Sequence, residues 1–231
     1  MAHAVGTAGR ASAVLAPPAL LVVLALIWSN PAAAQIRGRE PVVGQPCEGC
    51  GAIFVDLPDS LSFSGRIAPE DEPGEPMVIE GTVFDQEGRP APGVIVYGYH
   101  TNAAGIYPQA ARLRGTEASS HGRLRGWVRT DEEGRYRFRT IRPGAYPSRD
   151  NPEHVHMHVL EVGCCTYYLA SIKFTDDPLL SGADREAARE GRGGNALVTP
   201  RRTAEGVWLV QRDIYLGRGV PGYPGRSARA P

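Results

Sequence analysis

The chain has 231 residues, with 25 basic and 25 acidic side chains, so its formal net charge at pH 7 is zero. This length fits one domain of ordinary size with a real hydrophobic core. The charges are dispersed and Lys173 is the only lysine, which argues against a nucleic-acid surface, while 28 glycines and 20 prolines favour short strands over long helices.

Residues 1–34 are typical of a secretory signal. Arg10 precedes an apolar run from Val14 to Trp28, and Pro31-Ala32-Ala33-Ala34 offers small residues for cleavage before Gln35. Two prolines interrupt the run, and the part after them is shorter than the ~20 residues that a membrane-spanning helix needs. We therefore expect an exported protein, periplasmic or secreted, that begins at Gln35.

Residues 35–76 predict a polar N-terminal arm that contains Cys47-Glu48-Gly49-Cys50. Export favours oxidised cysteines, although Cys-x-x-Cys by itself also fits a redox or zinc site, and four cysteines allow three pairings. Because a polar arm has little apolar surface to bury, we predict that a disulfide ties it to the domain. The predicted bond joins Cys47 or Cys50 to Cys164 or Cys165.

A β-rich pattern begins at Met77 and predicts a domain over residues 77–218, followed by a tail at 219–231. The first two strands and the next two are joined by turns of one kind, at 85–88 and 131–134, which predicts two hairpins. Strands are expected at 78–84, 92–99, 124–130, 136–141, 155–161, 167–174 and 207–216. Only Asp184 to Glu190 has a helical pattern. About seven short strands indicate an all-β fold, an antiparallel β-sandwich of the transthyretin type with long loops and one short helix.

The strand around residue 156 carries three histidines. His154, His156 and His158 share one face, since side chains alternate along a strand. At ~3.3 Å per residue, the Cα atoms of His154 and His156 lie roughly 6.6 Å apart and their side chains can share an ion, whereas His158 is too distant from His154. A His-x-His pair by itself is more often a polar strand face than a metal site, so the upstream residues decide.

Two loops upstream each supply a tyrosine, in Asn102-Ala103-Ala104-Gly105-Ile106-Tyr107 and in Pro143-Gly144-Ala145-Tyr146-Pro147. Together with His154-Val155-His156, these motifs resemble the intradiol ring-cleavage dioxygenases, the family of catechol 1,2-dioxygenase and protocatechuate 3,4-dioxygenase. The resemblance runs from about Gly81 to Leu180. It implies a non-haem Fe(III) bound by Tyr107, Tyr146, His154 and His156. The chemistry agrees, because imidazole suits iron and a trivalent metal stabilises a phenolate.

The resemblance also implies a reaction. Tyr107 and His154 would be equatorial ligands, and Tyr146 and His156 axial ones. In the family, the axial tyrosine leaves the iron when a catecholate chelates it, and O2 then opens the activated ring between the two hydroxyl-bearing carbons. The implied protein is an oxidoreductase of aromatic catabolism whose partners are a small aromatic diol and O2. Neither nucleic acid nor membrane is implied, and oligomerisation is left open.

Three positions depart from the family pattern. Asn151 stands where many members carry an arginine that stabilises charge on the substrate, Ser171 replaces a glutamine, and His158 replaces a small residue. Arg149 or Lys173 is a candidate to supply the missing charge. We accordingly assign Tyr146, Arg149 and Asn151 as catalytic positions, and expect catechol to bind but to turn over slowly.

Two other functions fit parts of the sequence. A non-catalytic transthyretin-like β module that binds a partner or a glycan explains the strands and turns, but leaves the tyrosines and histidines to chance. Zinc held by the histidines for hydrolysis is the other, and it lacks a carboxylate ligand because Glu153 is expected on the opposite strand face. Iron content and visible colour distinguish the dioxygenase from both.

Overall fold

The computed structural model describes residues 1–4, 6, 39–47 and 49–225. The signal predicted at residues 1–34 falls almost wholly outside them, as do the last six residues of the predicted tail. The chain divides into two units, residues 1–35 and 36–231, and the fold below is that of the second. Within the described ranges, no helix has the length and apolar character needed to cross a membrane.

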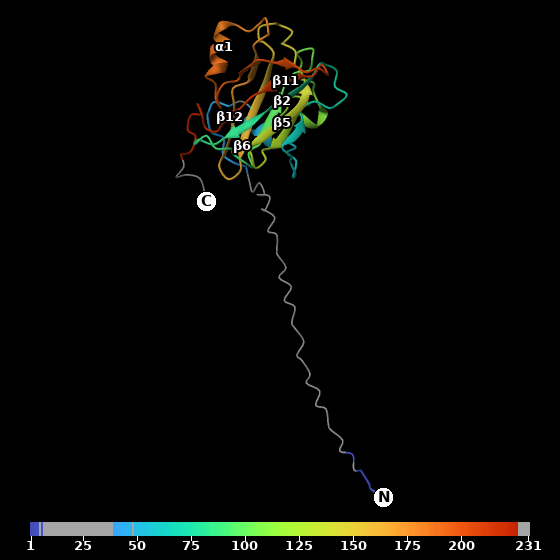
Figure 1. The fold of residues 1–231 in the computed structure, drawn as a ribbon. Helices are drawn as coiled ribbons and strands as arrows, with labels where there is room; N and C mark the ends of the chain where they lie inside the picture. The colour runs from blue at the N-terminus through green and yellow to red at the C-terminus, as the bar shows by residue number, and fades with distance from the viewer. Residues whose placement is uncertain (5, 7–38, 48, 226–231) are drawn as a thin grey trace. The chain divides into compact units, whose positions relative to one another are not determined.

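The second unit is built mainly of strands in two sheets. One sheet contains, in spatial order, β1 (Ser64–Arg66), β5 (Arg135–Ile141), β2 (Pro76–Phe84), β11 (Trp208–Gln211) and β10 (Arg201–Arg202), with β12 (Ile214–Tyr215) also paired to β2. The other contains β4 (Arg125–Arg129), β3 (Ile95–Tyr99), β6 (His154–Glu161), β8 (Ile172–Phe174) and β9 (Leu197–Val198), with β7 (Cys165–Tyr168) also paired to β6. Figure 1 shows β2, β5 and β11 side by side in the first sheet.

Helical structure is confined to three short elements in the described part of the second unit: η1 (Cys50–Phe54), η2 (Ala111–Leu113) and α1 (Gly182–Arg189). Only α1 is an α-helix, close to the predicted Asp184–Glu190. It begins with a capping box, in which Ser181 and Asp184 each accept a hydrogen bond from the other's backbone N–H. The predicted all-β fold with one short helix is confirmed.

The main core lies between the two sheets. β5 alternates as predicted: Tyr136 and Phe138 are buried, while the arginines between and beside them are exposed. From the other sheet, Val155, Met157 and Val159 of β6 enter the same apolar cluster. The histidines of β6 therefore lie on the opposite face of their sheet.

That opposite face is also covered. Ile95, Tyr97 and Tyr99 of β3 form a second buried cluster, together with Ile53 of η1 and Leu113 of η2. As a result β3 is buried along its whole length and no residue of β6 is exposed. The second sheet therefore has an interior on each side.

The two predicted hairpins are wrong. β2 and β3 lie in different sheets, and so do β4 and β5. In each pair, the two strands pack their apolar side chains on the shared core from opposite sides. The segment that connects them therefore passes from one sheet to the other. The turn at 85–88 forms as expected, with the Asp85 carboxylate accepting the backbone N–H groups of Glu87 and Arg89 at 2.9 Å each.

The sheets are mixed, where the sequence predicted antiparallel pairing throughout. β1–β5, β2–β11, β2–β12 and β8–β9 are parallel pairs, and the remaining pairs are antiparallel. Parallel neighbours need a long connection, and α1 lies in the one between β8 and β9. Two expected strands are each split in two, the first into β7 and β8, the second into β11 and β12.

The arm is attached by packing and backbone hydrogen bonds. Val43 donates to the carbonyl of Thr166, and Thr166 donates to that of Pro41, both at 3.0 Å. Further along, Ile53 is fully buried against the second sheet, so the arm has more apolar surface than its composition indicated. The side chain of Arg125 donates to the carbonyls of Ala52 and Val55 in the same stretch.

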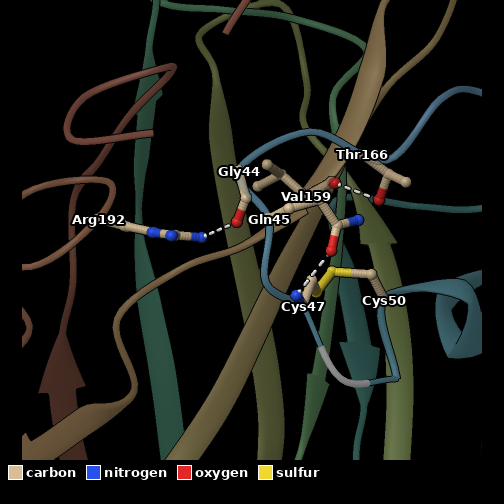
Figure 2. Close-up of a disulfide and its surroundings, with 7 residues drawn as sticks. All are labelled: Gly44, Gln45, Cys47, Cys50, Val159, Thr166 and Arg192. Carbon is tan, nitrogen blue, oxygen red and sulfur yellow. Dashed lines mark hydrogen bonds between the residues drawn. A yellow bond between two sulfur atoms is a disulfide. The ribbon is translucent and has the colours of Figure 1, made fainter. Parts of the chain in front are cut away.

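The predicted disulfide between arm and domain is wrong. Cys47 bonds Cys50 within the arm, with a Cα–Cα distance of 5.8 Å, and the Sγ atoms of Cys164 and Cys165 lie 2.7 Å apart. Figure 2 shows the Cys47–Cys50 bridge beside Gln45, whose side-chain oxygen accepts the Cys47 N–H. Gly49 has a positive φ of 71°, which lets a three-residue separation close into a bridge.

Candidate metal centre

Four side-chain atoms converge at one end of β6. The Tyr107 hydroxyl lies 3.1 Å from that of Tyr146 and 2.9 Å from Nε2 of His156. Nε2 of His154 closes the set, at 3.0 Å from Nε2 of His156 and 3.5 Å from the Tyr146 hydroxyl. The structure therefore brings together the four side chains that the sequence predicted as ligands, in a closed ring of two oxygens and two nitrogens.

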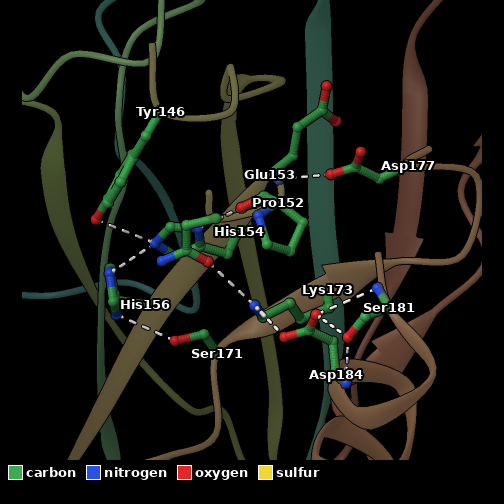
Figure 3. A network of polar contacts seen from close by, with 11 residues as sticks. Tyr146, Pro152, Glu153, His154, His156, Ser171, Lys173, Asp177, Ser181 and Asp184 are labelled. Atoms are coloured by element: carbon green, nitrogen blue, oxygen red, sulfur yellow. Dashed lines mark hydrogen bonds and ion pairs between the residues drawn. The ribbon is translucent and has the colours of Figure 1, made fainter. Parts of the chain in front are cut away.

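The outer nitrogens of both imidazoles are engaged. Nδ1 of His154 lies 2.7 Å from the carbonyl oxygen of Pro152 and donates to it, since a carbonyl can only accept. Nδ1 of His156 lies 3.1 Å from Oγ of Ser171. His154 therefore presents the lone pair of its Nε2 to the ring of donors, and His156 does the same when its Nδ1 donates to the Ser171 hydroxyl, as metal-binding histidines do. Figure 3 shows both imidazoles and their outer partners.

Glycines hold the two tyrosine loops against each other. Gly105 has a φ of 76°, and a Cβ there would collide with the carbonyl oxygen of Ala145. Gly144 donates its N–H to the carbonyl of Asn102 at 3.0 Å. The glycines of the two motifs thus allow the close approach that brings Tyr107 and Tyr146 within 3.1 Å.

The charges of these donors fit a cation. Burial lowers the pKa of His154, and burial together with the neighbouring His154 and His158 lowers the pKa of His156 well below its usual range, so both rings are neutral at pH 7. Burial and the hydrogen bond to Tyr146 raise the pKa of Tyr107. The Nε2 nitrogens of His154 and His156 lie 3.0 Å apart. When both carry a lone pair that faces the other, the lone pairs repel unless a positive ion lies between them. A metal ion removes that repulsion and turns the phenol into a phenolate ligand.

A single lysine lies beside the histidines. Lys173 of β8 is the cross-strand neighbour of His154, and its Nζ lies 3.3 Å from both Oδ1 of Asn151 and Oδ1 of Asp184. Its positive charge contributes to the lowered pKa of His154 and of His156. Figure 3 shows the Lys173 ammonium beside the Asp184 carboxylate, which also takes part in the capping box of α1.

The other predicted site residues lie further out. Arg149 is exposed, has a positive φ of 55°, and closes a turn by donating its N–H to the Tyr146 carbonyl at 2.7 Å. Glu153 accepts from Nε of Arg142 at 2.7 Å and lies outside the ring of donors. Asn151 is half-buried and meets Lys173.

A cavity of about 510 Å³ adjoins the ring of donors and is lined by Tyr107, Tyr146 and His156. Its wall also contains Tyr99 and His121, which sequence reasoning missed. The Tyr99 ring stacks on His121 with centroids 3.6 Å apart, and on His156 at 4.5 Å. Tyr99 pairs with His156 across two strands, a contact between distant residues that no local pattern reveals.

Comparisons with known proteins point to one family. A family model described as Dioxygenase matches residues 54–203, more than half of the chain. The chain is 34% identical over 147 residues to the protocatechuate 3,4-dioxygenase beta chain of Burkholderia cepacia, covering 61% of this chain and 59% of that protein. It is 40% identical over 112 residues to catechol 1,2-dioxygenase 1 of Acinetobacter lwoffii, covering 48% and 33%.

A solved structure shares the fold. Catechol 1,2-dioxygenase of Acinetobacter sp. ADP1, inhibited by bound mercury, superposes with a TM-score of 0.52 at 23% identity, covering 69% of this chain and 59% of that one. The chain thus spans 59% or less of the length of each of these three proteins. The match to the family model contains the two tyrosine loops and the histidine strand, and the chain belongs to the intradiol ring-cleavage dioxygenase family.

Proposed function

We propose that the chain is a non-haem Fe(III) dioxygenase that uses O2 to open a catechol-like aromatic ring between its two hydroxyl-bearing carbons. The observation that carries the proposal is the ring of four donors, Tyr107, Tyr146, His154 and His156, of which all but His154 line a cavity. Family membership supports it, since the relatives' names describe catechol and protocatechuate dioxygenases.

The protein's own contribution begins with the ligand positions. Bound ferric iron supplies Lewis acidity toward the two oxygens of the diol and makes its ring reactive toward O2. Pro152 and Ser171 fix the two imidazoles, so that both Nε2 atoms face the same point. Tyr99 lies between His121 and His156 and stacks on both, so it fixes the plane of the His156 imidazole at the cavity wall.

Tyr146 is the donor best placed to move. Its contact with His154, at 3.5 Å, is the longest of the four, and it sits in a loop at the cavity wall. As a phenolate in the metal-bound protein, its oxygen would accept a proton from a substrate hydroxyl as the diol binds, which would leave Tyr146 a neutral phenol. Tyr107 stays in place, since its hydroxyl has close contacts to both Tyr146 and His156.

Lys173 is our candidate for the positive charge that arginine supplies in many relatives. Its charge already acts on both histidines, and the exposed Arg149 has no such connection to them. A preorganised positive group near developing negative charge is worth on the order of a hundredfold in rate. Lys173→Met is expected to lower turnover by that order while catechol still binds, and Arg149→Ala to leave turnover unchanged.

The deciding experiment is metal analysis and visible spectroscopy of protein isolated in air. We expect about one iron per chain and a phenolate-to-iron colour that shifts when catechol is added, with O2 consumption matching ring-opened product. Tyr107→Phe is expected to weaken iron retention and Tyr146→Phe to change the colour. Tyr215→Phe is the matched control, because Tyr215 belongs to the first sheet and pairs with β2.

A colourless protein that holds stoichiometric zinc ends the dioxygenase proposal. A colourless protein with no metal, but with its fold intact, favours the transthyretin-like binding module instead. We also propose that the enzyme works after export, on the strength of residues 1–34. A processed N-terminus at Gln35 in protein recovered from the periplasm is the expected result, and an intact Met1 there contradicts it.

A further inference from the structure

A second set of metal-binding atoms lies beside the cavity, apart from the ring of four donors. The Sγ atoms of Cys47 and Cys50 and one ring nitrogen of His158 all lie within 4.8 Å of one another. His158 lines the cavity, and so does Pro46, the neighbour of Cys47. In the structure the two sulfurs are joined in a disulfide.

His158 has a buried atom without a hydrogen-bond partner. Its side chain is 2% exposed, and Nδ1 has no partner among the described residues. The ring is held by aromatic contacts, including an edge-on contact with Tyr97 at a centroid distance of 5.6 Å. Buried polar atoms nearly always have a partner, so an unpartnered nitrogen on an imidazole that lies next to two sulfurs points to a ligand.

The chemistry of the three groups is that of a soft metal site. Two thiolates and one imidazole suit zinc, and two cysteines three positions apart are the usual spacing for a zinc-binding turn. With Zn–S near 2.3 Å and Zn–N near 2.0 to 2.1 Å, donors in a tetrahedral site are roughly 3.3 to 3.8 Å apart. Donors already within 4.8 Å of one another need only a small rearrangement.

We propose that reduction of the Cys47–Cys50 disulfide creates a zinc site formed by Cys47, Cys50 and His158, and that the oxidised bridge excludes the metal. The reductant is a dithiol: it transfers two electrons and two protons, becomes a disulfide itself, and leaves two cysteine thiols. Zinc then displaces both thiol protons. Cys47 is only partly buried whereas Cys50 is 3% exposed, so the dithiol attacks at Cys47.

Among the residues that the structure describes there is one competing cluster, of Glu161, Cys164 and Cys165, whose donor atoms also lie within 4.8 Å of one another. Its carboxylate is already used, because one oxygen of Glu161 accepts from the Tyr167 hydroxyl at 2.8 Å and both accept from that of Tyr223 at 2.9 Å. Glu161 is therefore a satisfied buried acid. This cluster supplies matched control variants in the same protein.

The test uses the full iron-loaded protein with cobalt(II) as a probe. We expect no thiolate-to-cobalt absorption before reduction, and one equivalent of tetrahedral, sulfur-bound cobalt after treatment with a dithiol that is then removed without oxygen. Cys47→Ser is expected to abolish the signal, and His158→Ala to weaken cobalt binding at least tenfold. Cys164→Ser is expected to keep the signal. Tyr107→Phe is expected to keep it too even where iron is lost, which separates this site from the proposed iron site.

A second measurement identifies the cysteines directly. After reduction, zinc is expected to protect Cys47 and Cys50 from alkylation, as read by peptide mass spectrometry, and zinc removal to restore their labelling. If His158→Ala does not fold, His158→Gln takes its place. The proposal is overturned if reduced protein binds no cobalt through sulfur, if the signal survives Cys47→Ser, or if zinc protects only Cys164 and Cys165.

Discussion

The outer face of the first sheet is exposed to solvent along β5, whereas the outer face of the second sheet is covered along β6. In the first sheet, β5 turns Arg135, Arg137 and Arg139 to solvent and only its inner residues are buried. In the second, β6 has no exposed residue, because η1, η2 and the tyrosine loops cover its outer face. A face shielded from water can keep imidazoles neutral and force donor atoms together. The first sheet therefore supplies stability, and the second supplies the candidate metal centre.

The largest expected effect is a loss of stability caused by a substitution on the inner face of the first sheet. Phe138→Ala removes a fully buried ring of β5 and is expected to lower the free energy of unfolding by about 3–5 kcal/mol. The visible spectrum of the folded, iron-loaded variant is expected to match the wild type, since Phe138 packs in the core with Val155 and Met157, on the face of β6 opposite the histidines. Denaturant unfolding measures the first effect. A changed spectrum with unchanged stability would show that the two sheets are not separable.

A smaller effect is expected from the covered face of the second sheet. Ser171→Ala deletes the partner of His156 Nδ1 and is expected to weaken metal retention about 10- to 100-fold, with little change in unfolding. Competition with a chelator measures the retention. Ser64→Ala is the matched control, since Ser64 accepts from Arg139 on the exposed face of the first sheet. Equal retention in both variants contradicts the role assigned to Ser171.

His100 follows β3 of the second sheet, contacts β5 of the first, and makes the stability of the fold depend on pH. Its Nδ1 lies 2.6 Å from the Thr101 carbonyl, and its Nε2 lies 2.5 Å from Oγ1 of Thr140 on β5. Burial lowers the pKa of His100 from 6.5 to about 4. Between these two values the unfolded chain binds more protons than the folded one, so stability is lost as pH falls below 6.5.

At pH 5 this contribution amounts to a loss of about 2 kcal/mol relative to pH 8. His100→Gln keeps the hydrogen-bonding capacity and is expected to lose correspondingly less stability over that interval. Denaturant titrations at both pH values, on wild type and variant, measure the difference. Identical losses in the two proteins would remove His100 as a source of the pH dependence.

The smallest expected effect lies on the exposed face. Arg137 pairs with Glu80 across β5 and β2, and its side chain is 44% exposed. Such a pair contributes less than about 1 kcal/mol, and salt screens it. Arg137→Ala is therefore expected to leave metal retention unchanged and to shift unfolding only slightly. A loss comparable to that of Phe138→Ala would contradict the division between inner and outer faces.

Local patterns predicted much of this arrangement. The alternation in β5 and the common face of His154 and His156 follow from the two-residue period of a strand, and both are found. The tyrosine loops came from the family resemblance, and the structure places their hydroxyls 3.1 Å apart. These features depend on residues near one another in sequence or on the short motifs that carry the family resemblance.

The errors concern contacts between distant segments. The same turn chemistry serves a hairpin and a crossing between sheets, so residues 85–88 could not distinguish the two. The arm is polar overall but contains the short apolar run Ala52 to Val55, which contacts a distant strand: Nε1 of Trp127 donates to the Ile53 carbonyl at 2.8 Å. His121 had no pattern of its own, because it precedes β4 in an irregular segment and is placed by stacking on Tyr99.

The packing of Gly105 against Ala145 makes the conformation of each tyrosine loop depend on the other loop. Any side chain at Gly105 would push the loops apart and displace both oxygen donors together. In a laboratory library that varies one loop to change substrate preference, substitutions at this contact would collide with the other loop. They would be tolerated only together with a compensating change in that loop. The two motifs are separated by almost forty positions in the chain, yet the freedom of each to evolve is set by the shape of its partner.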